Sequence, residues 1–221
     1  MRPTPTALRA LGRVCLPLCV VAAMTAACAS SSSSDDRETP TSVPMSAAVT
    51  PPPGQPVRTG PGTALTFGES AILPADAFAA NGSRAMFTVT GITVAQGVPE
   101  EITKGGTAYF FYVTVTSLSS RVAPAPTTVG FAGSADGRDA ALTLASTPGL
   151  PGCPVTTVPE RMRRGDSYST CLVSVADPDQ RLGQVIYWAD TTSNSALDYK
   201  SDPVVWSLPT PPSASVTPSA G

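Results

Sequence analysis

The sequence predicts an all-β protein, a single antiparallel β-sandwich, and two observations support this prediction. Residues 109–116 place Phe111, Val113 and Val115 on one face and threonines on the other. This period of two is typical of a half-buried strand. About eight short segments of this kind follow one another between turn signals. Since no window shows helical periodicity longer than about two turns, the spacing favours a sandwich.

The remaining strands are identified by the same alternation. In residues 86–94 the apolar positions change parity across Gly91, which predicts a β-bulge at this glycine. Residues 171–175 form a third clear strand, which begins at Cys171. Shorter strands are expected at 64–70, 127–132, 140–145, 184–188 and 203–208. Five large aromatic residues are expected in the core or on a sheet face: Tyr109, Phe111, Tyr187, Trp188 and Trp206.

Proline is distributed unevenly and indicates the domain organisation. Seven prolines and a serine run lie in residues 29–63, and four prolines lie in residues 208–221. Such segments bury too little apolar surface to offset the entropy cost of ordering them. We therefore expect a disordered Ser/Thr/Pro-rich tether at 28–63 and a disordered tail at 209–221. The β-sandwich domain is expected between them, at residues 64–208.

The N-terminus has the pattern of an export signal. Arginines precede an uncharged stretch at 14–27, which is too short for a membrane-spanning helix and typical of a signal peptide. The stretch ends in Thr25-Ala-Ala before Cys28. This resembles the lipobox of bacterial lipoproteins, although Thr25 stands where leucine is usual. The resemblance implies a signal peptide at 1–27 and acylation of Cys28, for example by palmitate, with anchoring to the outer face of the cytoplasmic membrane. The alternative is an ordinary secretory signal cut near Ala27.

Two cysteines remain in the expected mature chain besides Cys28. Because an exported protein meets an oxidising environment, we expect Cys153 and Cys171 to form a disulfide. Two thiolates cannot supply the four ligands of a structural zinc site, so we expect no metal here. Their spacing also differs from the C-x-x-C pattern of redox-active pairs.

Composition excludes several classes of function. The chain has no histidine, which excludes a Ser-His-Asp or Cys-His triad and a histidine-ligated metal. A formal net charge of −2 argues against a nucleic-acid partner. Two carboxylate pairs, Glu100-Glu101 and Asp177 with Asp179, could in principle serve a hydrolase. Neither lies in a recognisable catalytic or Ca²⁺-binding pattern, so we expect solvated turns, no cofactor and no enzyme activity.

One small basic cluster is a candidate contact surface. Arg161, Arg163 and Arg164 lie close together in the sequence, beside the turn Gly165-Asp166. The cluster could contact an anionic cell-wall polymer, and the alternative is a solvated face of a turn.

The order of these features resembles a known family. The strand that begins at Tyr109 is followed by a variable segment and Ala135-Asp-Gly-Arg, then by a Gly165-Asp turn, the strand at 170–175, and Val185-Ile-Tyr-Trp. This layout is similar to the immunoglobulin-like domains of unknown function on exported actinobacterial and firmicute lipoproteins, and to small immunoglobulin-like antigens that mycobacteria secrete. The resemblance implies an immunoglobulin-like sandwich at the cell surface.

We therefore predict a cell-surface lipoprotein whose domain is a non-catalytic binding module of the cell envelope. Its partners are expected to be the membrane, through Cys28, and an envelope protein or polymer. One alternative is a structural accessory protein of an envelope complex. A carboxylate-dependent hydrolase is the other alternative.

Overall fold

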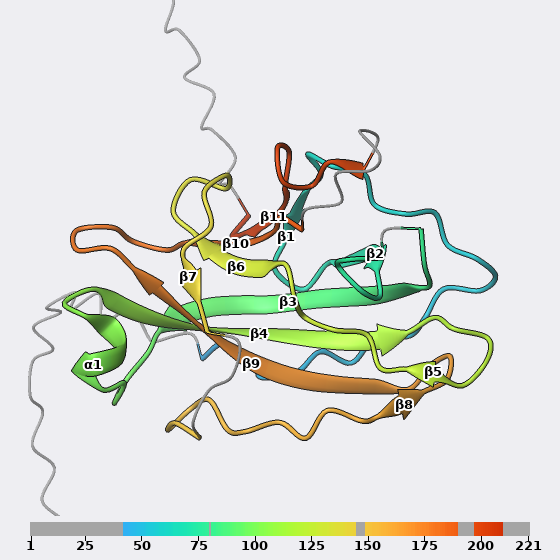
Figure 1. Cartoon of the computed structure of the whole chain (residues 1–221), viewed down its shortest axis with the longest axis horizontal. Coiled ribbons are helices and arrows are strands. Elements are labelled where there is room, and N and C mark those ends of the chain that lie inside the picture. Colours follow the sequence, from blue (N-terminus) through green and yellow to red (C-terminus); the bar gives the residue numbers. More distant parts are fainter. Residues whose placement is uncertain (1–41, 80, 145–148, 190–196, 210–221) are drawn as a thin grey trace, which may run out of the picture. The chain divides into compact units, whose positions relative to one another are not determined.

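Figure 1 shows a computed structural model of the chain, which describes residues 42–79, 81–144, 149–189 and 197–209. All of these residues belong to one compact unit. Within it, two β-sheets pack face to face, which confirms the predicted all-β sandwich. The described residues contain one short helix, α1 (Glu100–Thr103), and no helix with the length and apolar character to cross a membrane.

The larger sheet has five antiparallel strands in the order β2-β3-β4-β9-β7. Its long central strands cross the whole unit in Figure 1. The strand bounds are β2 Ser70–Pro74, β3 Arg84–Val94, β4 Thr107–Ser117, β7 Leu142–Thr143 and β9 Ser167–Ala176.

The smaller sheet has four strands in the order β1-β11-β10-β6. Its outer pair, β1 and β11, is parallel, which corrects the expectation of antiparallel sheets throughout. The strand bounds are β1 Ala64–Thr66, β6 Phe131–Ser134, β10 Gln184–Tyr187 and β11 Val204–Ser207. A separate ribbon pairs β5 (Ala123–Pro124) with β8 (Arg161–Met162).

Aromatic side chains fill the space between the two sheets. The ring of Phe131 lies 5.1 Å from those of Phe87 and Tyr187 and 5.8 Å from that of Trp206. Phe87 and Trp206 are completely buried, as is Phe111 on β4. These side chains come from both sheets, so their apolar area holds the two layers together.

The predicted β-bulge is confirmed. The pairing of β3 with β4 shifts register between Val89 and Gly91. A Cβ atom on Gly91 would lie 2.7 Å from a methyl carbon of Val43, closer than such contacts allow. Glycine therefore permits both the change in strand parity and the close approach of the N-terminal chain.

The stretch expected as one strand at 64–70 belongs to two strands in different sheets. The chain reverses at Gly68, whose φ of +95° favours glycine, between the end of β1 and the start of β2. The strands expected at 127–132 and 140–145 also differ from prediction: β6 begins only at Phe131, after a turn at 129–130, and ends at Ser134, and β7 consists of Leu142 and Thr143.

Residues 42–63, which we call the strap, correct the expected domain boundary. They were expected to be part of a disordered tether, but most of them lie against the larger sheet and the last ones lie beside β11 (blue to cyan in Figure 1). The backbone N–H of Ala47 donates to the Thr114 hydroxyl at 2.9 Å. Further along, the N–H of Thr59 donates to the carbonyl of Ile72 at 2.9 Å. The strap therefore also runs beside β2.

The strap is ordered for two physical reasons. It has apolar side chains that pack on the sheet, and its carbonyl groups accept hydrogen bonds from arginine side chains. Val43 and Val49 are half-buried and pack against apolar clusters on the outer face of the larger sheet. Prolines lack an N–H but keep their carbonyl group. The carbonyl of Pro52 accepts from the Arg164 guanidinium, and that of Pro56 accepts from Arg84 at 2.8 Å.

The other predictions for the termini concern residues that the structure does not describe. The signal peptide at 1–27, the acylation site Cys28, the first part of the tether and the tail from residue 210 all lie outside the described residues.

Candidate functional site

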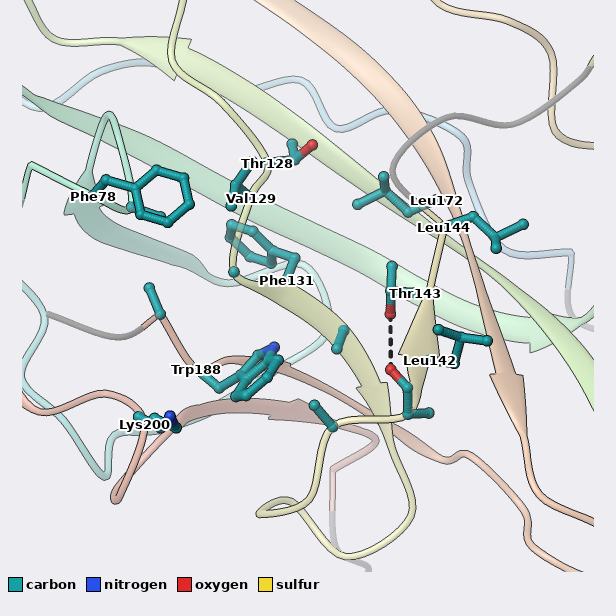
Figure 2. A pocket seen from close by; sticks show the side chains of 16 residues that line it. Phe78, Thr128, Val129, Phe131, Leu142, Thr143, Leu144, Leu172, Trp188 and Lys200 are labelled. Atoms are coloured by element: carbon teal, nitrogen blue, oxygen red, sulfur yellow. Dashed lines mark hydrogen bonds between the residues drawn. The ribbon is translucent and has the colours of Figure 1, made fainter.

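An apolar groove lies at the edge of the sandwich where β6 and β7 meet (Figure 2). Its volume is about 600 Å³. The lining comes from the turn before β6, from β6 itself, from β7 and its neighbours, from Leu172 on β9, and from loops after β2 and β10. Segments distant in the sequence therefore build one concave surface.

Four large apolar side chains on this surface are held open to solvent. Phe78 is 82% exposed, Leu142 63%, Val129 48% and Trp188 36%. Trp206, the other tryptophan, is completely buried. Clusters of large exposed apolar groups around a concave surface are typical of binding sites, whereas single exposed apolar residues are common everywhere.

The loop that carries Phe78 is held by its own turn. The N–H of Phe78 donates to the Asp76 carboxylate at 2.9 Å, and the N–H of Ala79 donates to the Asp76 carbonyl at 3.0 Å. This Asx-type turn sets the backbone direction of the loop without using the aromatic side chain. The ring of Phe78 therefore stays exposed at the groove.

Trp188 is placed by a backbone contact between the residue after β10 and the turn before β6. Its N–H donates to the carbonyl of Gly130 at 2.9 Å. Gly130 has a φ of +92°, and a Cβ atom there would lie 2.9 Å from the Cβ of Ala189. Only glycine fits this position, which lets the two backbones approach closely and brings the indole to the groove.

At the edge of the groove, the hydroxyl of Ser174 on β9 connects this strand to β6 and β7. Ser174 is completely buried. It accepts from the N–H of Gly133 on β6 at 2.8 Å and lies 2.6 Å from the Thr143 hydroxyl on β7. The carbonyl of Gly133 accepts from the N–H of Ala141 at 2.9 Å. Both backbone groups of Gly133 are thus occupied within the protein.

The core behind the groove contains one unusual polar atom. The ring of Tyr187 packs on that of Phe131, and its buried hydroxyl has no hydrogen-bond partner among the described residues. Burial strongly raises the pKa of Tyr187, and the nearby Tyr199 adds to this effect. The tyrosine is therefore neutral at physiological pH and does not add charge beneath the groove.

The lining of the groove is mainly apolar. Lys200 is the one charged residue among the described residues that line it. Neither a carboxylate nor a cysteine is among these described residues. Three or more metal-ligating side chains do not cluster anywhere in the described part of the chain.

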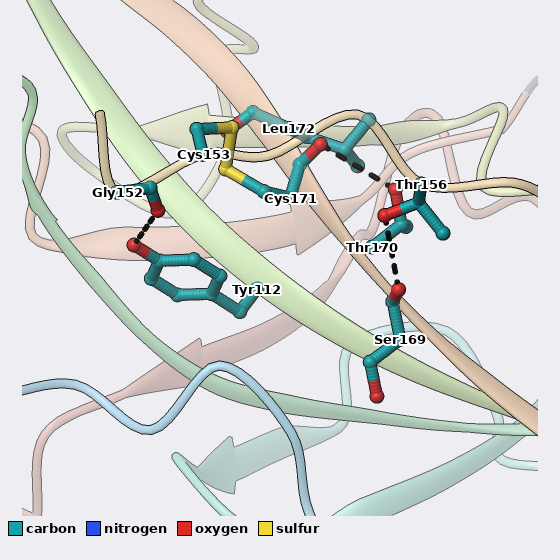
Figure 3. The surroundings of a disulfide bond; sticks show 8 residues. All are labelled: Tyr112, Gly152, Cys153, Thr156, Ser169, Thr170, Cys171 and Leu172. Atoms are coloured by element: carbon teal, nitrogen blue, oxygen red, sulfur yellow. Dashed lines mark hydrogen bonds between the residues drawn. A yellow bond between two sulfur atoms is a disulfide. The ribbon is translucent and has the colours of Figure 1, made fainter. Parts of the chain in front are cut away.

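The predicted disulfide is present on the other face of the larger sheet (Figure 3). Cys153 and Cys171 are bonded, with their Cα atoms 5.4 Å apart. Because successive residues of a strand point to opposite faces, Cys171 lies in the outer apolar cluster while Leu172 reaches the groove. The Tyr112 hydroxyl also donates to the Gly152 carbonyl at 2.6 Å, which fixes the same loop.

The arginine cluster does not line the groove, and two of its members have structural contacts. Arg164 donates to the Leu118 carbonyl at 3.1 Å and to Pro52 of the strap. Arg161 donates to the Val122 carbonyl at 3.3 Å. Arg163 is exposed. Two of the three guanidinium groups thus hydrogen-bond to backbone carbonyls of the chain itself.

The carboxylate pairs lie apart from the groove. Glu100 and Glu101 are exposed in the first turn of α1. Asp177 and Asp179 are exposed in the turn after β9, where Asp179 lines a wider, more polar depression at the other end of β10. Sequence reasoning missed the groove altogether, because its exposed aromatic residues show no pattern that separates them from core residues.

Comparisons with known proteins give little similarity at the sequence level. No protein-family model matches the chain, and no curated protein matches it. Among solved structures, the secreted protein MPT63 of Mycobacterium tuberculosis is similar, with 11% identity and a TM-score of 0.44 over 65% of this chain and 95% of that chain. The sandwich is therefore defined by the strand order and packing of this chain.

Proposed function

We propose that this chain is an exported, lipid-anchored protein of the cell envelope whose β-sandwich is a non-catalytic binding module that takes an apolar ligand in the groove. One observation carries the proposal: Phe78, Val129, Leu142 and Trp188 are held exposed around a single concave surface. Leaving this much apolar surface in water is unfavourable, and an apolar ligand would remove it from water. The groove's size falls within the range of ordinary small-molecule sites.

The anchoring part of the proposal starts from the N-terminal sequence. Cleavage after residue 27 and acylation of Cys28 would leave residues 29–41 between the anchor and the strap. A flexible chain of that length spans on the order of 20 Å, less than the whole segment to residue 63 would. The module would therefore sit close to the membrane, which favours a ligand or partner found in the envelope.

Changing Cys28 to serine tests the anchor. The variant protein should appear in the medium instead of the membrane fraction. Two acyl chains anchor a protein stably, and the variant would carry no acyl chain at this position. An unchanged membrane fraction would contradict lipid anchoring.

A neutral solvatochromic dye such as Nile red tests the binding module. The full chain should bind the dye, and Leu142→Ser should weaken binding, because it removes an exposed apolar wall without opening the core. The matched control is Val155→Ser, an exposed valine at 68% outside the groove. Equal binding by wild type and both variants would contradict the proposal and favour a structural accessory role.

A further inference from the structure

We propose that the groove selects an anionic amphiphile, a carboxylate head group on one unbranched apolar chain. This inference rests on the proposed function and adds the chemical class of the ligand. Two observations support it: the distribution of charge and apolar surface along the groove, and the hydrogen bonds that already occupy the backbone of the neighbouring strand edge.

The charge of the lining points to an anionic head group. Lys200 is its one charged residue among those described, and no described carboxylate lines the groove. Asp198, two residues before Lys200, lies outside the lining; its carboxylate accepts the N–H of Ser201 at 3.0 Å, the main cause of its lowered pKa, and attraction to the Lys200 ammonium lowers that pKa further. An ammonium group carries three donors, so Lys200 can contact a ligand in addition to any protein partner.

The apolar surface is separated from that charge. In Figure 2, Lys200 is drawn on one side of the pocket with Trp188, and Leu142, Leu144 and Leu172 lie on the opposite side. A head group at Lys200 would therefore direct an apolar chain past Phe131 towards the leucines. The exposed lysine and the leucines together match the two ends of an amphiphile.

The strand edge beside the groove argues against an extended peptide as the ligand. A peptide that adds a strand needs free backbone N–H and carbonyl groups at the edge. On β6 the N–H of Gly133 already donates to Ser174, and its carbonyl already accepts from Ala141. What the groove offers a ligand is thus mainly side-chain surface, which suits a chain without backbone hydrogen bonds.

The test uses the full chain and three probes with the same alkyl chain: dodecanoate and dodecyltrimethylammonium, each below its micelle concentration, and dodecanol, below its solubility limit. Binding is followed by the fluorescence emission of Trp188, which is partly exposed. The emission of Trp206, which is buried, should not change. Trp188→Phe identifies the signal. We expect dodecanoate to bind most tightly and dodecyltrimethylammonium most weakly.

Lys200→Met should weaken dodecanoate binding by about fivefold, the factor expected for an exposed ion pair, and should leave dodecanol unchanged. Lys200→Arg should restore dodecanoate binding, which a merely structural role of the lysine would not predict. Leu142→Ser should weaken all three probes, and Val155→Ser none.

The outcomes separate this inference from the proposed function. If dodecanol binds as well as dodecanoate, or if Lys200→Met affects them equally, the head-group selection is wrong while the apolar binding module stands. If none of the probes binds, the proposed function fails as well. Concentration-dependent dimerisation that Leu142→Ser abolishes, with no probe bound, would show that a second copy covers the groove and would overturn the inference.

Discussion

The Ser174 hydroxyl on β9 accepts the backbone N–H of Gly133 on β6 at 2.8 Å and so joins the two sheets at the edge of the groove. A side chain at Gly133 would prevent this approach, since its Cβ would lie 2.9 Å from the Cβ of Ser174. The contact combines a small residue on one strand with a short hydroxyl on the other. Since the same hydroxyl lies 2.6 Å from that of Thr143 on β7, it links β6, β7 and β9 beside the groove.

Ser174→Ala should lower the free energy of unfolding by about 1–3 kcal/mol, because it leaves the buried N–H of Gly133 without its acceptor. Denaturant unfolding measures the change. Ser167→Ala is the matched control, since this exposed serine of the same strand bonds within the larger sheet, to the Thr116 hydroxyl, and to its own turn. Equal stability of the two variants would show that the contact does not join the sheets.

Removing the disulfide should also destabilise the domain. The bond between Cys153 and Cys171 closes a loop with a sequence separation of 18. Replacing both cysteines by serine should cost roughly 3 kcal/mol, mainly because the unfolded chain regains entropy. Mass spectrometry of the non-reduced wild type should find the two peptides linked. Two freely alkylatable thiols in that sample would contradict the bond.

Arg164 should be needed to hold the strap. Its guanidinium donates to the carbonyls of Pro52 and Leu118, so Arg164→Ala should loosen the N-terminal segment. We expect faster hydrogen exchange at the Ala47 and Thr59 amides, which the strap contributes to the sheet face. Arg163→Ala, an exposed neighbour, is the control. Unchanged exchange in the Arg164 variant would mean that the valines alone hold the strap.

Alkaline pH should destabilise the protein through its buried tyrosines. Burial raises the pKa of Tyr168 to about 12 from the ordinary value of 10.0. The unfolded chain therefore loses this proton first, and stability is full below pH 10 and falls as the pH rises towards 12. The free energy of unfolding, measured from pH 8 to pH 11.5, should fall by up to about 1.4 kcal/mol per pH unit for one such group.

Tyr168→Phe provides the comparison for this titration. The variant loses the bond from the tyrosine hydroxyl to the Pro126 carbonyl, at 2.6 Å, and should be less stable at neutral pH. Its stability should nevertheless depend less steeply on pH above 10. The same slope in both proteins would show that Tyr168 does not contribute to alkaline unfolding.

Local patterns were sufficient where the physical cause lies within one strand or one pair of residues. Alternation placed Phe111 and Val113 correctly, and the parity change located the bulge at Gly91, because pleating alone decides which face a side chain occupies. The pairing of Cys153 with Cys171 followed from the export pattern and the number of cysteines left. None of these inferences needed the position of a distant segment.

The strap and the groove, by contrast, depend on contacts between distant segments. Residues 42–63 have the composition of a disordered tether, and their order comes from hydrogen-bond partners far along the chain, such as the Thr114 hydroxyl, which accepts, and the Arg164 guanidinium, which donates. Phe78, Leu142 and Trp188 meet only when loops from both sheets come together. The sequence by itself thus determined the strands, the bulge and the sandwich, whereas the tertiary structure decided which apolar residues stay exposed, because burial depends on what packs against each face.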